Sequence, residues 1–165
     1  MKNFKGQIFT TDFIFAATIF LFILVISITS FGLIQNSLSQ EEFFGEMQEK
    51  AVNASQILIS TQGTPNSWEL SESLAIDSIG ITKERNIIDE LKFKKLIEWN
   101  SSNYEEVKDL LGLGKYNFYF KLTEMNGKII EESGVFPSDS DKTIVIERYV
   151  LFEGEEKKFL LGVFE

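Results

Sequence analysis

An uninterrupted apolar segment near the N-terminus, residues 13–33, dominates the hydrophobic pattern of the chain. It reads FIFAATIFLFILVISITSFGL and contains no charged residue. A helix of this length rises about 31 Å, and the hydrocarbon core of a bilayer is about 30 Å thick. Its polar members are hydroxyl residues, which can bond to a carbonyl one turn earlier: Thr18, Ser27, Thr29 and Ser30. The pattern predicts a membrane-spanning helix, and we assign the transmembrane segment to residues 7–34.

Charged residues flank this segment unequally. Lys2 and Lys5 precede it, whereas four glutamates follow it before the next positive residue, Lys50. Positively charged flanks stay in the cytoplasm, which predicts a single-pass protein of the cell membrane, with a cytoplasmic N-terminus and an extracytoplasmic part from residue 35 onward. A cleaved secretory signal peptide is the alternative. Its apolar region would be only about 7 to 15 residues long and would precede a small-x-small cleavage site, for which Ile28-Thr29-Ser30 is a poor candidate.

Beyond the apolar segment, residues 35–61 have the pattern of an amphipathic helix. Apolar residues recur there at spacings of three and four: Phe43, Phe44, Met47, Ala51, Ala54 and Leu58. Glutamates and Lys50 occupy the other side, which is typical of a helix that packs one face on a core. No proline interrupts residues 13–61, and only Gly32 and Gly45 weaken the helical pattern, so we expect one helix of about 50 residues. Pro65 prevents it from continuing.

Two shorter helices are expected in the middle of the chain. The first runs from about Ile87 to Trp99, and its expected core residues are Ile88, Leu91, Leu96 and Trp99. The second runs from about Tyr104 to Leu111. Ser102-x-x-Glu105 has the form of a capping box at its start, and Gly112 suits a left-handed stop at its end.

The hydrophobic pattern also suggests structural roles for one tryptophan and two lysines near these helices. Trp68 lies in an irregular section at residues 66–85, where we expect it to plug one end of the core; a ligand platform is the alternative. Lys92 and Lys95 lie near the apolar side of the first short helix. Their stems can cover apolar surface, and we expect their ammonium groups to reach water.

From Tyr116 onward, apolar and polar residues alternate along the chain, which predicts β-strands. One face of the first strand is apolar, with Tyr116, Phe118, Phe120 and Leu122. Asn126-Gly127 indicates a hairpin to a return strand at residues 128–131. A long strand at residues 143–152 turns at Glu153-Gly154 into a last strand at residues 157–164, where Phe159, Leu161 and Val163 share a face. We therefore predict an α+β fold over residues 35–165. In it the second half of the long N-terminal helix packs, with two short helices, on a small four-stranded antiparallel sheet.

Charge and composition exclude several classes of function for residues 35–165. The chain has 16 basic and 25 acidic residues, a formal net charge of −9. A surface this acidic repels phosphate backbones, so we expect no nucleic-acid partner. The chain has no cysteine and no histidine, which excludes a thiolate nucleophile and removes the commonest general base and metal ligand. We therefore expect no enzyme, no cofactor and no metal site.

The remaining polar motifs are short. Adjacent acidic pairs such as Glu105-Glu106 favour solvated surfaces, so a membrane-tethered enzyme acting through carboxylates is the least favoured function. Ser138-Asp139-Ser140-Asp141 has part of a calcium loop but lacks its glycine and closing glutamate, and we expect a polar loop there. Two Asn-x-Ser sequons make Asn100, between the predicted short helices, and Asn53, on a helix, candidates for N-glycosylation.

Lys5-Gly6-Gln7 lies immediately ahead of the apolar segment. Here the chain resembles the archaeal type IV pilin-like precursors with a class III signal peptide. In that family a prepilin-type peptidase removes a short basic leader before a glutamine. The resemblance implies a leader at residues 1–6, processing at Lys5, Gly6 and Gln7, and a mature N-terminus at Gln7. The family usually has a serine two residues after the glutamine and a glutamate four residues after it; here these are Phe9 and Thr11, and the acid is Asp12.

Asp12, at the edge of the apolar segment, has two interpretations. Under the resemblance, Asp12 of one chain neutralises the freed amine of Gln7 on another when helices bundle, since that amine is mostly protonated at neutral pH. A carboxylate is costly in the bilayer, by up to about 2.5–3.5 kcal/mol at its centre, and pairing offsets part of this cost. In the alternative interpretation, Asp12 lies at headgroup level at the start of the helix, with Thr10 or Thr11 as the cap.

The middle of the chain carries a second resemblance. Gly63-x-Pro65-x-x-Trp68, Ile79-Gly80-Ile81 and Tyr104-x-x-x-Lys108-x-Leu110-Leu111-Gly112 occur in this order ahead of an aromatic strand. The order is similar to that in the outer domains of archaeal membrane-anchored proteins that share the pilin-like N-terminus. This likeness implies an extracytoplasmic head on a helical anchor.

We therefore expect a pilin-like or minor-pilin-like surface protein, anchored and assembled through its N-terminal helix, with an acidic head for interaction. Its expected partners are membrane lipid, pilin-like subunits or other membrane proteins, and the prepilin-type peptidase. The alternative is a permanently anchored single-pass protein whose outer domain binds a partner or ligand. The displaced acid at Asp12 favours this alternative.

Overall fold

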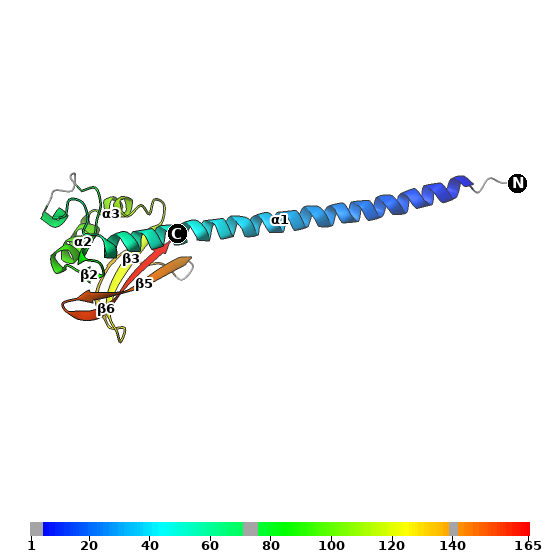
Figure 1. The fold of residues 1–165 in the computed structure, drawn as a ribbon. Coiled ribbons are helices and arrows are strands. Elements are labelled where there is room, and N and C mark those ends of the chain that lie inside the picture. The colour runs from blue at the N-terminus through cyan, green and yellow to red at the C-terminus, as the bar shows by residue number, and fades with distance from the viewer. Residues whose placement is uncertain (1–4, 71–75, 139–141) are drawn as a thin grey trace. The chain divides into compact units, whose positions relative to one another are not determined.

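A single helix, α1 (Lys5–Ser60), forms the N-terminal part of the chain (Figure 1). The computed structural model describes residues 5–70, 76–138 and 142–165. Within these ranges it describes every side chain except those of residues 5–11 and 33–41. The chain divides into two compact units, with the boundary between Phe44 and Gly45. Helix α1 passes through both Gly32 and Gly45, where the sequence alone left its continuity open. A glycine inside a helix costs only about 1 kcal/mol relative to alanine.

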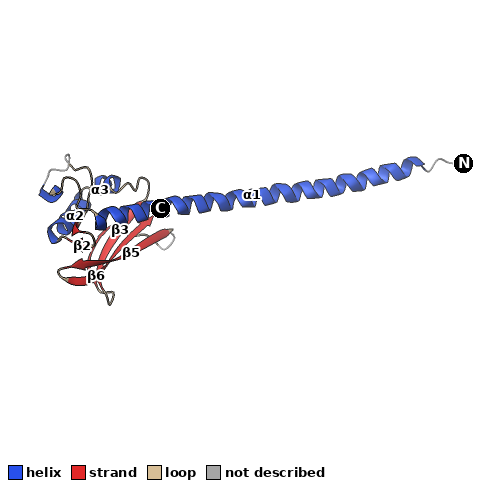
Figure 2. Ribbon diagram, viewed as in Figure 1, coloured by secondary structure: helices blue, strands red, loops and turns tan. Residues whose placement is uncertain are grey.

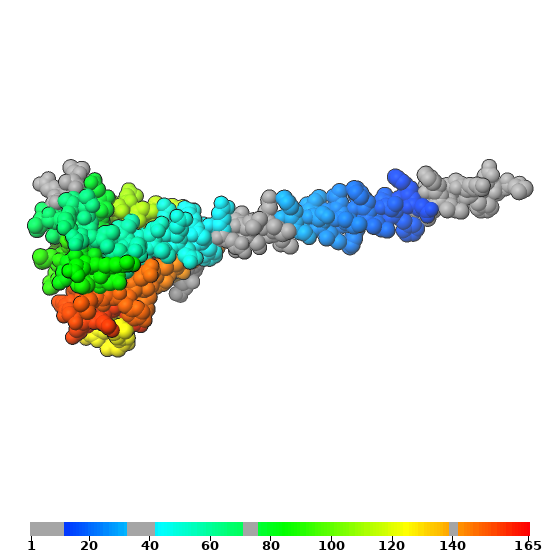
Figure 3. Space-filling model, in the orientation of Figure 1, coloured from blue at the N-terminus to red at the C-terminus, as the bar shows by residue number. Residues whose placement is uncertain are grey.

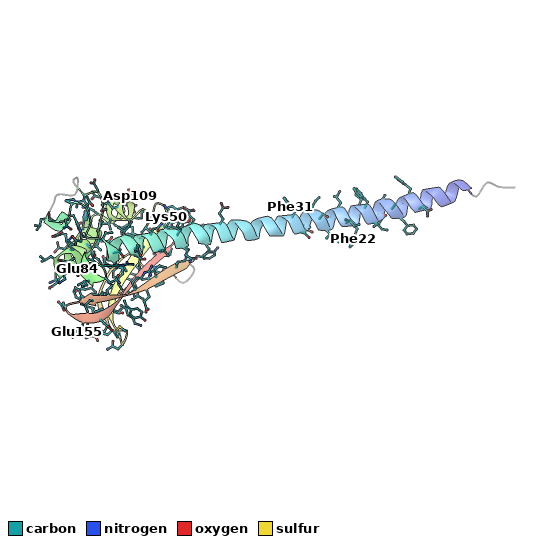
Figure 4. All side chains as sticks on the ribbon, viewed as in Figure 1. Phe22, Phe31, Lys50, Glu84, Asp109 and Glu155 are labelled. Carbon is teal, nitrogen blue, oxygen red and sulfur yellow. The ribbon has the colours of Figure 1, made fainter. Side chains whose placement is uncertain are left out.

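The first unit presents apolar side chains on all sides of α1. The large apolar residues at positions 13–31 are between 39% and 68% exposed, and they form the surface of this part of the helix (Figure 3). Phe22 and Phe31 both point away from the helix axis (Figure 4). The hydroxyls of Thr18 and Thr29 donate to the carbonyl oxygens four residues earlier, at 2.8 and 3.1 Å. Both hydroxyls are therefore satisfied within the helix, as predicted.

In the second unit, the end of α1 buries one face in the core. Four members of the predicted apolar stripe have no exposed surface: Met47, Ala51, Ala54 and Leu58. These last turns lie with α2 (Glu90–Ser102) and α3 (Tyr104–Leu110) over one face of the sheet (Figure 2). The backbone N–H of Ile81 donates to the carbonyl oxygen of Leu58 at 2.9 Å, which ties the end of α1 to the segment that leads into the sheet.

The sheet has six strands in the order β1-β2-β5-β6-β3-β4. Their bounds are β1 Thr82–Glu84, β2 Ile87–Ile88, β3 Asn117–Glu124, β4 Ile129–Gly134, β5 Thr143–Phe152 and β6 Glu155–Phe164. The prediction of four antiparallel strands is wrong for the whole sheet, although β3 to β6 form such a set. The short strands β1 and β2 extend it, and β2 pairs in parallel with β5 at Ile87 and Leu151. Strands of two and three residues are too short to show an alternating pattern.

The four longer strands place the predicted apolar face in the core. Fully buried side chains alternate along β3 and β6: Phe118, Phe120, Leu122, Phe159, Leu161 and Val163. Register pairs such as Phe120 with Leu161 put these side chains on one face of the sheet. The ring of Phe93 in α2 lies 6.0 Å from that of Phe120 and so covers this face. The core of the second unit therefore lies between the sheet and the helices.

Helix α2 begins later than predicted, because Asp89 caps it. The Asp89 Oδ1 accepts hydrogen bonds from the backbone N–H groups of Leu91 and Lys92, at 2.9 and 3.2 Å. Leu91 is 68% exposed, so its assignment to the core is wrong, and Phe93, 1% exposed, lies there instead. The helix turns toward the core the side that carries its buried residues, Lys92, Phe93, Leu96, Trp99 and Asn100. Leu91 lies off that side.

The capping box predicted for the next helix is wrong. Ser102 belongs to α2, where its Oγ donates to the carbonyl oxygen of Glu98 at 3.1 Å. The N-cap of α3 is Asn103, which makes no side-chain cap bond. Gly112, with φ +68°, follows α3 in the left-handed conformation, as predicted.

Candidate functional site

The predicted processing motif lies in the first turn of α1. Lys5, Gly6 and Gln7 are helical, and their side chains lie outside the described set. Asp12 is exposed and lies well inside α1, which begins at Lys5. The interpretation of Asp12 as the start of the helix, with Thr10 or Thr11 as its cap, is therefore wrong.

Among the described residues, Asp12–Gly32 is the one helical segment long and apolar enough to cross a membrane. It has 21 residues, and none of its candidate window is buried inside the protein. Asp12 is its only charged residue and stands at its N-terminal end. Exposed apolar surface on every side of a helix is typical of a segment that contacts lipid or other helices.

The two predicted glycosylation sites differ in access. Asn53 is exposed on α1. Asn100 lies in α2 rather than between helices, is only 3% exposed, and its Nδ2 donates to the Ser133 Oγ at 2.9 Å. A glycan on that nitrogen does not fit the folded domain, because the atom is enclosed and bonded. Asn53 is therefore the more accessible of the two candidates.

In two of the acidic pairs on the described surface, one of the two glutamates contacts a lysine. Glu105 contacts Lys108, and Glu155 contacts Lys157. Lys157 lowers the pKa of the Glu155 carboxyl through a side-chain hydrogen bond. Within residues 5–70, 76–138 and 142–165, no group of three or more acidic side chains is placed to hold a metal ion. Asp139 and Asp141, of the calcium-loop fragment, lie outside the described residues.

Trp68 is part of the core, as predicted, and not a ligand platform. It begins the short 3-10 helix η1 (Trp68–Leu70) and has no exposed surface. Its Nε1 donates to the carbonyl oxygen of Gly80 at 2.8 Å. Its ring lies 5.9 Å from that of Trp99, so both tryptophans of the chain pack against each other inside the second unit.

The second unit also contains a hollow that the sequence did not indicate. Arg85 and Arg148, the only arginines of the chain, both line it. Its volume is about 310 Å³. The last turns of α1 contribute Gln56 and Ser60, and the turn between β1 and β2 contributes Asn86. Three segments that are far apart in the sequence therefore meet around two guanidinium groups.

A second hollow adjoins the first and shares Arg85, Asn86 and Tyr149 with it. Its volume is about 490 Å³. It is also lined by apolar side chains, Met125 and Leu151 among them, and by the acidic Glu156. Arg85 lines both hollows, whereas Arg148 lines only the first.

Sequence reasoning missed these hollows because neither arginine belongs to a motif. The only signal available was their rarity, two arginines among 16 basic residues. Arginine differs from lysine in presenting a planar fork of donors that matches a carboxylate. The separation of the two residues along the chain, 85 to 148, hid their convergence.

No protein-family model, curated protein or solved structure matches this chain.

Proposed function

We propose that the protein is a pilin-like subunit of the cell membrane, anchored and assembled through the first half of α1, with the α+β unit as an extracytoplasmic head. The observation that carries this proposal is the exposed apolar surface of Asp12–Gly32. In water such a surface costs about 25 cal/mol for each Å² of apolar area. Burial in lipid, or against copies of the same helix, removes that cost.

The same helix continues as α1 into the head, where its other end is part of the core. The charge asymmetry around the segment, with Lys2 and Lys5 before it and glutamates after it, supports a cytoplasmic N-terminus.

Asp12 supplies the proposed assembly contact. It is exposed, so its carboxylate is available to a neighbouring chain. Processing before Gln7 frees an amine close to the same end of the helix. Pairing of the amine with Asp12 of another chain joins opposite charges where lipid leaves little water to solvate them.

Mass spectrometry of the protein isolated from native membranes tests the proposal. We expect an N-terminus at Gln7 and high-mass assemblies after mild crosslinking. Asp12→Asn is expected to reduce the assemblies, whereas Glu49→Gln, which removes a carboxylate from an exposed position farther along α1, leaves them unchanged. An N-terminus at Met1 together with the absence of assemblies contradicts the proposal.

A permanently anchored single-pass protein is the second candidate. The position of Asp12, one residue later than the acid of the pilin-like family, favours it. Under this candidate the N-terminus stays at Met1, and the chain co-purifies from membranes with a different protein. Recovery only as assemblies of its own chain rules this candidate out.

A further inference from the structure

Strand β5 leaves one of its two edges unpaired over its first half. On one side the whole strand pairs with β6. On the other side β2 pairs with it only at Leu151, whose backbone N–H donates to the carbonyl oxygen of Asn86 at 2.8 Å. Backbone groups of alternate residues point to the same edge of a strand, so those of Val145 and Glu147 also point to this open edge. Within the described part of the chain, no backbone hydrogen bond reaches either residue there.

The other edges of the sheet carry features that oppose pairing with a second sheet. Strand β1 has only three residues, and two of them are charged, Lys83 and Glu84. Strand β4, at the opposite edge, carries the exposed Glu131 and Glu132. Short strands and charged side chains are the devices that keep sheet edges from associating. The start of β5, residues 143–146, has neither, because it reads Thr-Ile-Val-Ile within a strand of ten residues.

The side chains beside this edge leave it accessible. Val145 pairs in register with Gly162, which lies between the buried Leu161 and Val163 of β6. Its side chain therefore leaves the sheet on the face turned away from the core, where it is 47% exposed. Farther along the same edge, Glu147 lines a hollow and not a packed contact. An approaching strand meets open backbone groups and β-branched side chains, which favour strand pairing.

Charge favours a second copy of this chain as the occupant of the edge. The net charge of the chain is −9, so two copies repel each other wherever their acidic surfaces meet. Residues 143–146 carry no charge, and two such segments approach each other without that cost. Their β-branched side chains also pack well against cross-strand neighbours of the same kind.

We propose that two copies of the chain pair in antiparallel fashion through the open edges of β5, with Val145 opposite Val145 of the second copy at a two-fold axis. Thr143 of each copy then lies opposite Glu147 of the other, so no like charges face each other within the paired strands. A register centred on Glu147 places two carboxylates opposite each other, which is destabilising. It also brings the second copy closer to β2, which already occupies this edge at Leu151.

This pairing goes beyond membrane anchoring and depends neither on it nor on assembly through the first half of α1. Every residue that carries the pairing lies in the second unit, which begins at Gly45. The two contacts can therefore be tested separately.

Single-cysteine crosslinking of the full-length protein, in a detergent extract of native membranes, tests the pairing, since the chain has no cysteine of its own. In the proposed register the two Val145 Cα atoms lie about 5.5 Å apart, within the range of about 4.4–6.8 Å that a disulfide spans. We expect Val145→Cys, oxidised with copper phenanthroline, to form a disulfide-linked dimer. Glu147→Cys is the matched control on the same face and edge. Its two copies lie about 13 Å apart, so we expect no more dimer from it than from Glu132→Cys on β4.

A proline tests whether backbone groups carry the pairing. The N–H of Glu147 points to the open edge, so Glu147→Pro removes no hydrogen bond within the sheet but removes a donor of the dimer. Added to Val145→Cys, it is expected to abolish the crosslink, whereas Glu147→Thr, which keeps the N–H, retains it. The fluorescence of Trp68 and Trp99, both buried, checks that each variant is folded.

Four outcomes overturn the proposal. The first is the absence of the Val145→Cys dimer, including its replacement by a mixed disulfide with a different protein. The second is equal crosslinking of Val145→Cys and Glu147→Cys, which indicates parallel pairing or random collision. The third is a crosslink that survives Glu147→Pro. The fourth is a crosslink that Asp12→Asn removes, because the contact then follows from assembly through α1; we expect Asp12→Asn to leave it unchanged.

Discussion

The indole Nε1 of Trp68 donates a 2.8 Å hydrogen bond to the carbonyl oxygen of Gly80. This contact links Trp68 to the C-terminal end of α1, because Gly80 in turn packs against the backbone of Thr61. The ring of Trp68 also lies directly over Gly63, which has φ +83°. Two glycines therefore leave room for one tryptophan and one helix end.

Replacing Gly80 is expected to disrupt this packing. A Cβ at Gly80 overlaps with the carbonyl oxygen of Thr61, which is backbone and cannot rotate away. We expect Gly80→Ala to lower the free energy of unfolding by about 1–3 kcal/mol or more, measured by chemical denaturation of the detergent-solubilised chain. Trp68 and Trp99 supply the fluorescence signal, since both are buried in the second unit.

Gly45→Ala is the control for this substitution. It adds the same methyl group in α1, where nothing lies within 4 Å. Alanine is the better helix former by about 0.8–1 kcal/mol, so stability is expected to rise or stay unchanged. Equal destabilisation by both alanines contradicts the close packing at Gly80.

Lys92 is expected to contribute to stability through its ammonium group. It is 5% exposed, and its Nζ donates to the carbonyl oxygens of Gln62 and Asn66, at 2.6 Å each. Lys92→Met keeps the length of the stem but removes both bonds. We expect a loss of about 1–2 kcal/mol, because the carbonyls belong to exposed residues and water can partly replace the donor.

Lys95→Met provides the comparison in the same helix. The side chain of Lys95 is 43% exposed, and its Nζ is 4.0 Å from Glu98. Exposed pairs of this kind contribute at most about 1 kcal/mol and often nothing, so the midpoint of denaturation is expected to stay nearly unchanged. A smaller loss for Lys92→Met than for Lys95→Met argues against the role of the buried ammonium.

Tyr104 is expected to stabilise the start of β3 through its hydroxyl. The hydroxyl oxygen accepts from the N–H of Phe118 at 2.8 Å, and the hydroxyl donates to the carbonyl oxygen of Phe118 at 3.3 Å. Tyr104→Phe removes both bonds in a partly buried setting, so we expect a loss of about 1–2 kcal/mol. Tyr149→Phe, at a side chain 60% exposed, is expected to have little effect on stability.

The effect of Tyr104 is also expected to depend on pH. Burial raises the pKa of the Tyr104 hydroxyl above its ordinary value of about 10. The unfolded chain therefore ionises first, so this stabilisation is fully present below pH 10 and is lost as the pH rises through the folded pKa. The difference in unfolding free energy between the unaltered protein and Tyr104→Phe should narrow above pH 10. A difference that stays constant there contradicts the assignment.

The exposed apolar surface of α1 is expected to hold the chain in the membrane. Phe22 lies at the middle of Asp12–Gly32. A lysine there costs about 2.5–3.5 kcal/mol in the bilayer, while each remaining large apolar residue favours insertion by only about 0.3–0.6 kcal/mol, so Phe22→Lys is expected to lower, without abolishing, the fraction of the chain that resists carbonate extraction. Gln48→Lys adds the same charge at an exposed position of the second unit and should remain in the membrane. Equal retention of both variants contradicts the spanning assignment.

Several elements follow from local pattern alone. The apolar stripe of α1 from Met47 to Leu58, the strand Thr143–Phe152 and the left-handed stop at Gly112 match their predictions, whereas Phe44 of the predicted stripe is exposed. Each depends on interactions within a few residues: a helical period, an alternating period or the freedom of glycine at positive φ. The processing motif and Asp12 are likewise local, since they are defined by their distance from the apolar segment.

Other features depend on contacts between distant segments, and no local pattern records them. Lys92 is buried because the carbonyls of Gln62 and Asn66 happen to lie over α2, and a short parallel strand forms because β2 ends beside β5. Arg85 and Arg148 line one hollow only when that pairing is made.

By itself, the amino-acid sequence determined which faces of the longer elements are apolar, because burial of apolar surface imposes a period on each of them. Only the tertiary structure decided which elements became neighbours. That choice depends on packing and hydrogen bonding across the whole core, and it alone brought the two arginines together.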